Sequence, residues 1–409
     1  MKTRALIFSM MFAATVQAQD VVSNLLYEEV KSEDVDWEED DISFINDIEP
    51  RDASHSTIVD YGCDEYYIQS LVWKRQTELR PQDANAWLNY FRHTRYYLRT
   101  AGFPDDYQTE TLMKILDEMG KSIPDTYEYH ACAYYVPSVD QETANQHAEK
   151  ALEKLSAKKA KMTFFDYDTW FTYLHLRGDK ARYVSFAKEY LNSGLYSQEL
   201  ILQNMNELNG MKANGIFIGE GDTSIIPKWL IADGMGKHQD KVMICYSFLG
   251  NPDYCQKIYS NLGIGEVPVH EGEFSDYEEY QEYMKEIIMA IAERTGRELY
   301  FSKYNGEDVN GAWEGDLYDE GLVYHYSSKE YDAMKVKRHN FEKVYDLGYL
   351  LKPLNDHPWK TDLTMSWRKT NEFSDLLAYY KSHDQKRYEQ LHDILKSSID
   401  RVNNVQETE

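Results

Sequence analysis

ANGIFIGEGDTSIIPKWLIADGMGKHQDKVMICYSFLG, residues 213–250, is the stretch that decides the fold. Two short apolar runs, Gly215–Ile218 and Val242–Tyr246, enclose a glycine-containing turn and an amphipathic segment. Continuous apolar runs of this length suit strands that are covered on both faces. The stretch therefore predicts one strand–helix–strand unit whose polar groups gather at the turn around Asp222.

The chain beyond this unit continues to alternate helix and strand. Asn251 and Pro252 predict a helix start with a capping residue followed by proline at the first helical position. Two further apolar runs, residues 298–302 and 321–326, predict strands, and an apolar stripe before them predicts a helix over residues 276–294. Because crossovers between parallel strands are almost always right-handed, this order predicts a three-layer parallel sheet of at least three strands.

The predicted fold class is α+α/β, with boundaries that follow the change of period. A small Rossmann-like three-layer parallel-sheet domain is expected over residues 213–335. C-terminal helices, including a terminal helical pair, are expected over residues 336–409. A helical domain is expected over residues 61–212, because apolar residues recur there every three to four positions.

This helical domain resembles a tetratricopeptide-like helical-hairpin array. The break at Arg80-Pro81-Gln82-Asp83 is similar to the loop between tetratricopeptide-type hairpins, where a Pro-Asp turn precedes an Ala-x-x-Trp or Ala-Trp helix start. No unit carries the full consensus, and an irregular helical domain is the alternative. An array of this kind predicts an exposed groove lined by aromatic side chains for a partner. The candidates are Trp87, Tyr90, Trp170 and Tyr173, and the alternative is that aromatic side chains at helical spacing belong to the core.

The first 18 residues have the pattern of a signal peptide. Lys2 and Arg4 form a short basic end, and an apolar run leads to the small-residue cleavage site Val16-Gln17-Ala18. The apolar run is shorter than the ~20 residues of a spanning helix, which favours a signal over the alternative of a membrane anchor. The first cysteine is Cys63, so no lipid-anchoring cysteine is expected. We expect a periplasmic or secreted protein with no integral membrane segment after cleavage.

Residues 19–60 predict an acidic disordered leader. Residues 20–50 hold twelve Asp or Glu against Lys31. The formal net charge of the chain is −26, and it becomes −28 when the signal takes Lys2 and Arg4 with it. Such a charge repels phosphate backbones and anionic membrane surfaces, which argues against nucleic acid as a partner. The alternative for the leader is a tail that docks on a basic partner or gathers divalent cations.

The four cysteines do not form a disulfide scaffold or a zinc site. Cys63, Cys132, Cys245 and Cys255 include no C-x-x-C pair. An oxidising compartment would allow one disulfide. Buried or unpaired thiols are favoured, because Cys245 lies in an apolar run and a thiol can serve as a small buried side chain.

Polar side chains follow the predicted strands at one edge of the sheet. Ligands of open parallel sheets bind at the carboxyl ends of the strands, where loops and helix N-termini meet. Carboxylate, hydroxyl and lysine groups at such an edge could hold a metal, a phosphate or a sugar. The ligand-binding candidates are Glu220, Asp222, Thr223, Ser224, Asn251 and Lys303. No dinucleotide, Walker, H-E-x-x-H or G-x-S-x-G motif is present, so the catalytic residues and the cofactor are unknown.

A structural role is the alternative for the turn itself. Gly219 and Gly221 allow a tight turn, while Asp222, Thr223 or Ser224 caps the next helix. Pro227 would then lie in the first helical turn, where a missing N–H is tolerated. The two interpretations differ in whether the turn faces backbone N–H groups or a ligand, and the residues alone leave both open.

The segment Gly221–Trp229, GDTSIIPKW, resembles a domain of bacterial envelope proteins of uncharacterised function. The family pattern is roughly G-D-N-D-T-Y-P-x-W, and the similarity covers roughly residues 120–350. In that family the domain occurs in secreted proteins with helical repeats and behind glycosyltransferase-like multispanning segments. Ser224 and Ile225 stand where the family has a second Asp and a Thr. Acid chemistry at Asp222 would therefore need Glu220 as its partner.

Two functions from different classes follow. The leading hypothesis is an exported cell-envelope binding or scaffold protein that acts through protein or glycan contacts of the helical-repeat array. The alternative is an enzyme, a hydrolase or transferase accessory, that acts on a phosphorylated or glycosidic substrate at the carboxyl edge of the α/β sheet. In the alternative, Asp222 is an acid/base or a metal ligand, Glu220 assists it, and Lys303 neutralises an anion.

Overall fold

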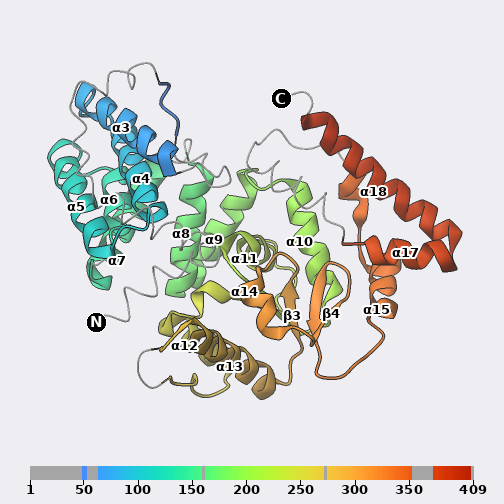
Figure 1. Cartoon of the computed structure of the whole chain (residues 1–409). Helices are drawn as coiled ribbons and strands as arrows, with labels where there is room; N and C mark the ends of the chain where they lie inside the picture. The colour runs from blue at the N-terminus through green and yellow to red at the C-terminus, as the bar shows by residue number, and fades with distance from the viewer. Residues whose placement is uncertain are drawn as a thin grey trace. The chain divides into compact units, whose positions relative to one another are not determined.

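The computed structural model describes residues 48–52, 63–137, 139–158, 162–270, 274–351 and 372–406. The predicted signal peptide and nearly all of the predicted acidic leader lie outside these ranges. The chain divides into two compact units, Met1–Tyr173 and Leu174–Glu409 (Figure 1). In the part of the chain that the structure describes, no helix is both long enough and apolar enough to span a bilayer.

The first unit is built from helices. They are α3 (Cys63–Leu79), α4 (Ala84–Thr100), α5 (Asp105–Ser122), α6 (Tyr127–Tyr134), α7 (Gln141–Lys158) and the first part of α8 (Phe164–Arg177). Helix α3 packs against α4, and α6 packs against α7. The apolar faces of α4 to α6 meet in a buried core that includes Phe91, Leu112 and Met119.

The predicted break between the first two helices is confirmed. Helix α3 ends at Leu79 and α4 begins at Ala84, with Asp83 as its N-cap. The Asp83 carboxylate accepts the N–H groups of Asn85 at 3.1 Å and Ala86 at 3.2 Å. An aspartate at this position satisfies backbone donors that the helix itself cannot. The turn therefore forms a helical hairpin at the place the sequence indicates.

The second unit combines helices with one small mixed sheet. Its strands are β1 (Ile216–Gly219), β2 (Val242–Cys245), β3 (Leu299–Ser302), β4 (Leu317–Asp319) and β5 (Val323–Tyr326). Its longer helices are α9 (Lys180–Asn192), α10 (Gln198–Gly210), α11 (Asp222–Trp229), α12 (Pro252–Leu262), α13 (Tyr277–Thr295), α17 (Ser374–His383) and α18 (Gln385–Gln406). Shorter helical turns are η5 (Leu230–Gly234), η6 (Tyr246–Phe248), α14 (Glu307–Asn310), η7 (Gly311–Trp313), α15 (Ala333–His339), η8 (Asn340–Val344) and η9 (Leu347–Leu351).

The strand order is β2-β1-β3-β5-β4. Strand β1 is parallel to β2 and to β3, with Ile216 opposite Val242 on one side and Leu299 on the other. Strand β5 is antiparallel to both β3 and β4. Every residue of β1 is buried, as its continuous apolar run predicts for a central strand.

The prediction of a wholly parallel sheet is wrong at β5. A three-residue link between Asp319 and Val323 joins β4 and β5 as a hairpin, and strands joined so tightly must be antiparallel. The sequence gives little sign of β4, because this strand is three residues long and each residue is only half-buried. The general α+α/β class is confirmed, as a helix-rich chain with a five-stranded mixed sheet.

The two units do not divide at the predicted boundary after residue 212. The division falls inside α8, so α9 and α10 belong to the unit that holds the sheet. Helix α10 is joined to this unit by the Asn206 side chain, which donates to the Asp346 carbonyl at 2.7 Å and accepts the Asp346 N–H at 2.9 Å. The predicted boundary after residue 335 falls inside α15.

The predicted terminal helical pair is confirmed as α17 and α18. Leu376 and Tyr380 of α17 pack with Leu391 of α18 in a buried cluster. Leu322, which directly precedes β5, belongs to the same cluster. The C-terminal helices therefore share an apolar core with the sheet and do not form a separate module.

All four cysteines are free thiols, and Cys132, Cys245 and Cys255 are buried. This agrees with the favoured interpretation of buried or unpaired thiols. Burial raises the pKa of Cys245 and of Cys255 to about 12. Protonated, buried thiols are poor nucleophiles and poor metal ligands, so these cysteines act as small apolar side chains.

Candidate functional site

Glu220 follows β1 and is bound to the loop after β3. Its N–H donates to Asn305 Oδ1 at 2.8 Å, and its Oε2 accepts the Gly306 N–H at 2.5 Å. Its carbonyl accepts the Ser247 N–H from the segment after β2 at 2.9 Å. The structure thus brings the carboxyl ends of β1, β2 and β3 to one edge, as parallel strands require.

Asp222, Thr223 and Ser224 form the first turn of α11, but the N-cap is Gly221. The Ser224 hydroxyl donates to the Gly221 carbonyl at 3.0 Å, and Gly221 makes no side-chain cap bond. The prediction that one of the three side chains sits at the cap is therefore wrong. The backbone is extended at Gly221 and helical from Asp222 onward. A side-chain cap at Asp222 would need the helix to begin at Thr223, one residue later. Pro227 lies inside α11.

Asp222 lies near the end of β2. Burial is the main reason that the pKa of the Cys245 thiol is raised, and the negative charge of Asp222 adds to the effect. Gly219 allows α11 to approach β1, because a Cβ at this position would collide with the side chains of Ser224 and Ile225. The Thr223 side chain lies outside the described part of the structure.

Asn251 caps α12, as predicted. Its side-chain oxygen accepts the N–H groups of Asp253 at 2.9 Å and Tyr254 at 3.4 Å, and Pro252 occupies the first helical position. The amide oxygen is therefore engaged with the helix that Asn251 begins. This contact supports a structural role for Asn251 at the sheet edge.

Lys303 follows β3 and binds Asp319 at the end of β4. Its Nζ donates to Asp319 Oδ2 at 2.8 Å and to the Gly321 carbonyl at 3.1 Å. The fully buried Lys337 of α15 donates to the same Asp319 oxygen at 2.8 Å and to Asp375 Oδ1 at 2.5 Å. Sequence reasoning missed Lys337, Asp319 and Asp375, because only the β4–β5 hairpin and the C-terminal helices bring them to this edge.

The sheet edge therefore contains two separate groups of polar contacts. Glu220 binds the loop after β3 on the β1 side, whereas Lys303 binds the end of β4. Glu220 and Lys303, which the enzyme hypothesis brings to Asp222, are held by Gly306 and Asp319 respectively. The groups at this edge bind one another, which leaves less capacity for a ligand.

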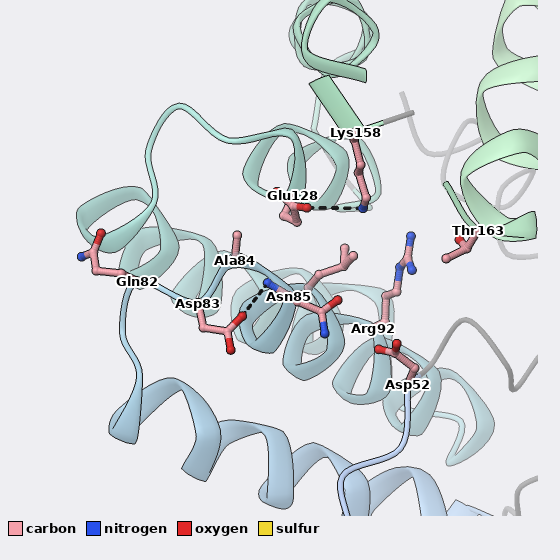
Figure 2. Close-up of a pocket in the computed structure, with 10 residues that line it drawn as sticks. Asp52, Gln82, Asp83, Ala84, Asn85, Arg92, Glu128, Lys158 and Thr163 are labelled. Carbon is pink, nitrogen blue, oxygen red and sulfur yellow. Dashed lines mark hydrogen bonds and ion pairs between the residues drawn. The ribbon is translucent and has the colours of Figure 1, made fainter. Parts of the chain in front are cut away.

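The first unit contains a polar cleft of about 580 Å³. It is bordered by the N-terminal half of α4, the first turn of α6, the end of α7 and the loop before α8 (Figure 2). This volume is in the range of pockets that bind small molecules. The ionisable side chains that line the cleft are Asp52, Asp83, Arg92, Glu128 and Lys158.

A fully buried carboxylate, Asp166, lies beside Arg92 and Lys158. Tyr127 Oη donates to Asp166 Oδ1 at 2.6 Å, and Trp170 Nε1 donates to Tyr127 Oη at 2.7 Å. Asp166 is the acidic member of a capping box at the start of α8. The N–H and hydroxyl of Thr163 donate to Asp166 Oδ2 at 2.9 and 3.0 Å, and the Asp166 N–H donates back to the Thr163 hydroxyl at 3.3 Å. These short bonds fix the carboxylate in position.

Arg92 and Lys158 approach the same carboxylate at longer distances. Arg92 Nη2 is 3.5 Å from Asp166 Oδ1, and Lys158 Nζ is 3.8 Å from Asp166 Oδ2. The Phe165 ring centroid is 3.9 Å from the Arg92 guanidinium carbon, and the Tyr127 ring centroid is 4.2 Å from Lys158 Nζ. Aromatic rings and the buried charge therefore hold both cations in place. Arg92 has five N–H donors, so the described contacts leave donors for a ligand.

The protonation of these groups matches the geometry. Burial alone would raise the pKa of Asp166, but Arg92, Lys158 and the hydrogen bonds to Thr163 and Tyr127 hold that pKa below its ordinary value. Burial alone would lower the pKa of Arg92, but Asp166 and other neighbours hold it above its ordinary value. Both groups are therefore charged at neutral pH.

Asp52 reaches the cleft from the segment that precedes α3. The Arg51 carbonyl accepts Trp73 Nε1 from α3 at 2.8 Å and His93 Nε2 from α4 at 3.0 Å. The Asn89 side chain then donates to Asp52 Oδ1. These bonds place an acidic side chain on the wall of the cleft from a part of the chain that lies more than 30 residues away in the sequence from Asn89.

The structure does not support the predicted aromatic groove. Trp87, Trp170 and Tyr173 are buried, and Tyr90 is only partly exposed. Aromatic side chains at helical spacing fill the core of the first unit, because burial of their large apolar area stabilises the folded state. The surface that could receive a ligand is instead the face of α4 that borders the cleft, on which Asn85, Leu88 and Arg92 follow one another at helical spacing.

Comparison of the chain with protein-family models, with curated proteins and with solved structures finds no match. The resemblance to the envelope-protein domain therefore stays a prediction from the sequence. Within the described ranges, no three His, Cys, Asp or Glu side chains are grouped as a metal ion would require. The charged side chains that line the cleft can recognise a ligand by charge and hydrogen bonds.

Proposed function

We propose that this chain is an exported binding protein of the cell envelope, and that its helical unit binds a polar ligand in the cleft between α4 and α7. The observation that carries the proposal is the pair Arg92 and Lys158, held against the buried Asp166 with donors left for a ligand. Export is inferred from the pattern of residues 1–18, and the tetratricopeptide-like arrangement from residues 61–212.

The support for binding comes from the way the cleft is built. A fully buried aspartate with three short hydrogen bonds is costly to form, and it positions two cations at the edge of a cavity. Charged donors that are already fixed in position lose little conformational entropy when a ligand binds. The ligand we expect is polar, because charged groups line the cleft and no aromatic side chain is among its described lining residues.

The enzyme hypothesis at the sheet edge has weaker support. Glu220 is bound to Gly306, and Lys303 is bound to Asp319, so neither is directed at Asp222 by a described contact. The resemblance of residues 221–229 is its remaining basis. We retain a hydrolase or transferase accessory as the alternative, which the variants below distinguish.

The test is a binding screen with the mature chain that begins at residue 19. Neutral oligosaccharides and short peptides of envelope origin are added in turn, and binding is measured by thermal shift and then by calorimetry. We expect at least one class to bind, and Lys158→Gln to weaken that binding about tenfold or more, because a charge-assisted bond is lost. Sequencing of the N-terminus of the exported protein tests cleavage after Ala18.

Lys154→Gln is the matched control, since Lys154 lies one turn earlier on the same helix and binds Asp125 at 2.8 Å, outside the cleft. A ligand whose affinity falls equally in both variants would overturn the proposed site. Loss of binding in Lys303→Gln, with Lys158→Gln unaffected, would move the site to the sheet edge and favour the enzyme. Failure of every compound to bind would refute a small-ligand binding function.

A further inference from the structure

The charges of the cleft are separated along α4. Arg92 and Lys158 reach into the same space from α4 and α7, whereas Asp83 lies at the other end of the cleft (Figure 2). Arg92 is nine residues beyond Asp83, which corresponds to about 13 Å along a helix. Asp52 is held by Asn89, only three residues before Arg92, or about 4.5 Å along the axis. A positive end and a negative wall therefore share one cavity.

A simple anion does not suit this cavity. The two cations are accompanied by three carboxylates, Asp166 beside both of them, Glu128 at 3.3 Å from Lys158 Nζ, and Asp52 on the wall, whereas Asp83 is paired with Arg80 at 3.1 Å. A ligand that brought only negative charge would add to a local surplus of it. At distances of 4 to 10 Å in a partly buried site, such repulsion outweighs what one good pair contributes.

A simple cation does not suit the cavity either. Its charge could be placed beside Asp52, but it would displace water from the N–H donors of Arg92 without offering them an acceptor. Removal of water from charged donors without a new acceptor makes the free energy of binding less favourable. The N-terminus of α4, which carries a partial positive charge, also lies at the Asp83 end.

We infer that the cleft binds a zwitterion of the amino-acid or short-peptide class. This inference rests on the proposed function, because it names the ligand of the same cleft. The ligand carboxylate accepts the guanidinium fork of Arg92 and Lys158 Nζ, and its ammonium group faces Asp52. Phe165 fixes the plane of the guanidinium, which favours a planar, bidentate acceptor.

The length of the cleft limits the length of the ligand. Asp52 is held by Asn89, one helical turn before Arg92, so a short zwitterion such as a dipeptide can face both side chains. Asp83 lies at the far end of the cleft and would need a longer ligand. Asp83 is already engaged with two backbone N–H groups and with Arg80 at 3.1 Å, so Asp52 is the stronger partner for the ammonium group.

The test uses di-alanine as the probe, and it changes the ligand before it changes the protein. Calorimetry with the mature full chain compares di-alanine that has free ends with its C-terminal amide and with its N-acetyl form. We expect the free peptide to bind, the amide to bind at least about tenfold more weakly, and the N-acetyl form to lose a smaller factor of about three to ten. These comparisons need no variant, so they do not depend on whether a variant folds.

Two variants assign the ends of the ligand. In Asp52→Asn the free and N-acetyl peptides should bind with equal affinity, because the acidic partner of the ammonium is lost. In Arg92→Lys the charge stays but the fork is lost, and the preference for the free acid over the amide should fall. Lys154→Gln should leave all three affinities unchanged, and melting curves report whether each variant is folded.

Three results would overturn the inference. If the amide binds as tightly as the free acid, no carboxylate is recognised. If neutral oligosaccharides bind in a way that needs Lys158 while di-alanine does not bind, the proposed binding function stands and the zwitterion is excluded. If neither class of compound binds, both the zwitterion and the proposed small-ligand function fail.

Discussion

The cleft of the first unit and the sheet edge of the second unit contain similar residues but use them differently. At the sheet edge, one oxygen of Asp319 receives both Lys303 and Lys337 at 2.8 Å. In the cleft, the close positions around Asp166 are taken by Tyr127 and Thr163, so Arg92 and Lys158 remain at 3.5 and 3.8 Å. Charges that neutralise one another hold a fold together. Lys158 also pairs with Glu128 at 3.3 Å, so Arg92 is the cation of this pair with more donors left for a ligand.

This difference explains why the edge, which fits a general rule about parallel sheets, is the weaker candidate. The rule places ligands at the carboxyl ends of strands because unpaired groups usually gather there. Here the added β4–β5 hairpin and the C-terminal helices bring partners to that edge. The predictions below test whether the two clusters differ in the way the contacts indicate.

The largest effect is expected for Asp166→Ala. It leaves the buried Arg92, with 8% of its side chain exposed, without its acidic partner and removes the acceptor of the Tyr127 hydroxyl. Loss of one member of a buried charge pair costs about 3–5 kcal/mol of unfolding free energy. Urea denaturation followed by tryptophan fluorescence measures it. A loss below about 1 kcal/mol would show that Asp166 does not organise the cleft.

The next effect is a loss of stability in acid that involves His93. Burial lowers the pKa of His93 from 6.5 to about 4, so the folded protein keeps this ring neutral while the unfolded chain protonates it. The stabilisation is complete above about pH 6.5 and is lost as the pH falls toward 4, by at most about 3 kcal/mol. His93→Gln should flatten the slope of unfolding free energy against pH in this window. An unchanged slope would contradict the assignment.

A smaller effect is expected for Asp319→Ala at the sheet edge. Asp319 neutralises Lys303 and Lys337, but its side chain is 32% exposed, so water can replace part of what is lost. Lys337 also keeps Asp375 as a partner. We expect a loss of about 1–3 kcal/mol by the same denaturation assay. A loss as large as that of Asp166→Ala would remove the distinction between the two clusters.

The smallest effects concern the helix caps, one in each unit. Asp83→Ala and Asn251→Ala each remove a side chain that accepts two backbone N–H groups, at a cost of about 1 kcal/mol. Gly221→Ala removes no such bond, and an added Cβ there meets nothing within 4 Å. We expect its melting temperature to stay within a few degrees of wild type. Equal losses in all three variants would mean that capping is not the cause.

Much of the fold could be predicted from local patterns. The apolar runs that became β1, β2 and β3, the turn at Asp83 and the cap at Asn251 depend only on neighbouring residues. Strand β4 and the direction of β5 could not be predicted, because a three-residue, half-buried strand has no pattern of its own. The domain boundaries were displaced for a similar reason, since α10 is joined to the second unit through Asn206 and the distant Asp346.

Less of the candidate site could be predicted. Residues 220–224 could be named as site candidates because ligands of parallel sheets bind at strand ends and these residues are adjacent in the sequence. No comparable rule predicts the cleft, since its residues come from four different segments: Asp52, Arg92, Lys158 and Asp166. The one local signal was the Thr163-x-x-Asp166 capping box, which marks a helix start but not the burial of its carboxylate.

By itself, the sequence determined the apolar runs of β1, β2 and β3, the turn at Asp83, the cap at Asn251 and the large negative charge of the chain. These properties depend on side-chain size, on backbone preference and on neighbours within one turn. Only the tertiary structure decided which charged groups neutralise one another and which remain open to a ligand. That outcome depends on distances of a few ångströms and on exclusion of water between residues far apart in the chain, because the strength of an ion pair is set by both.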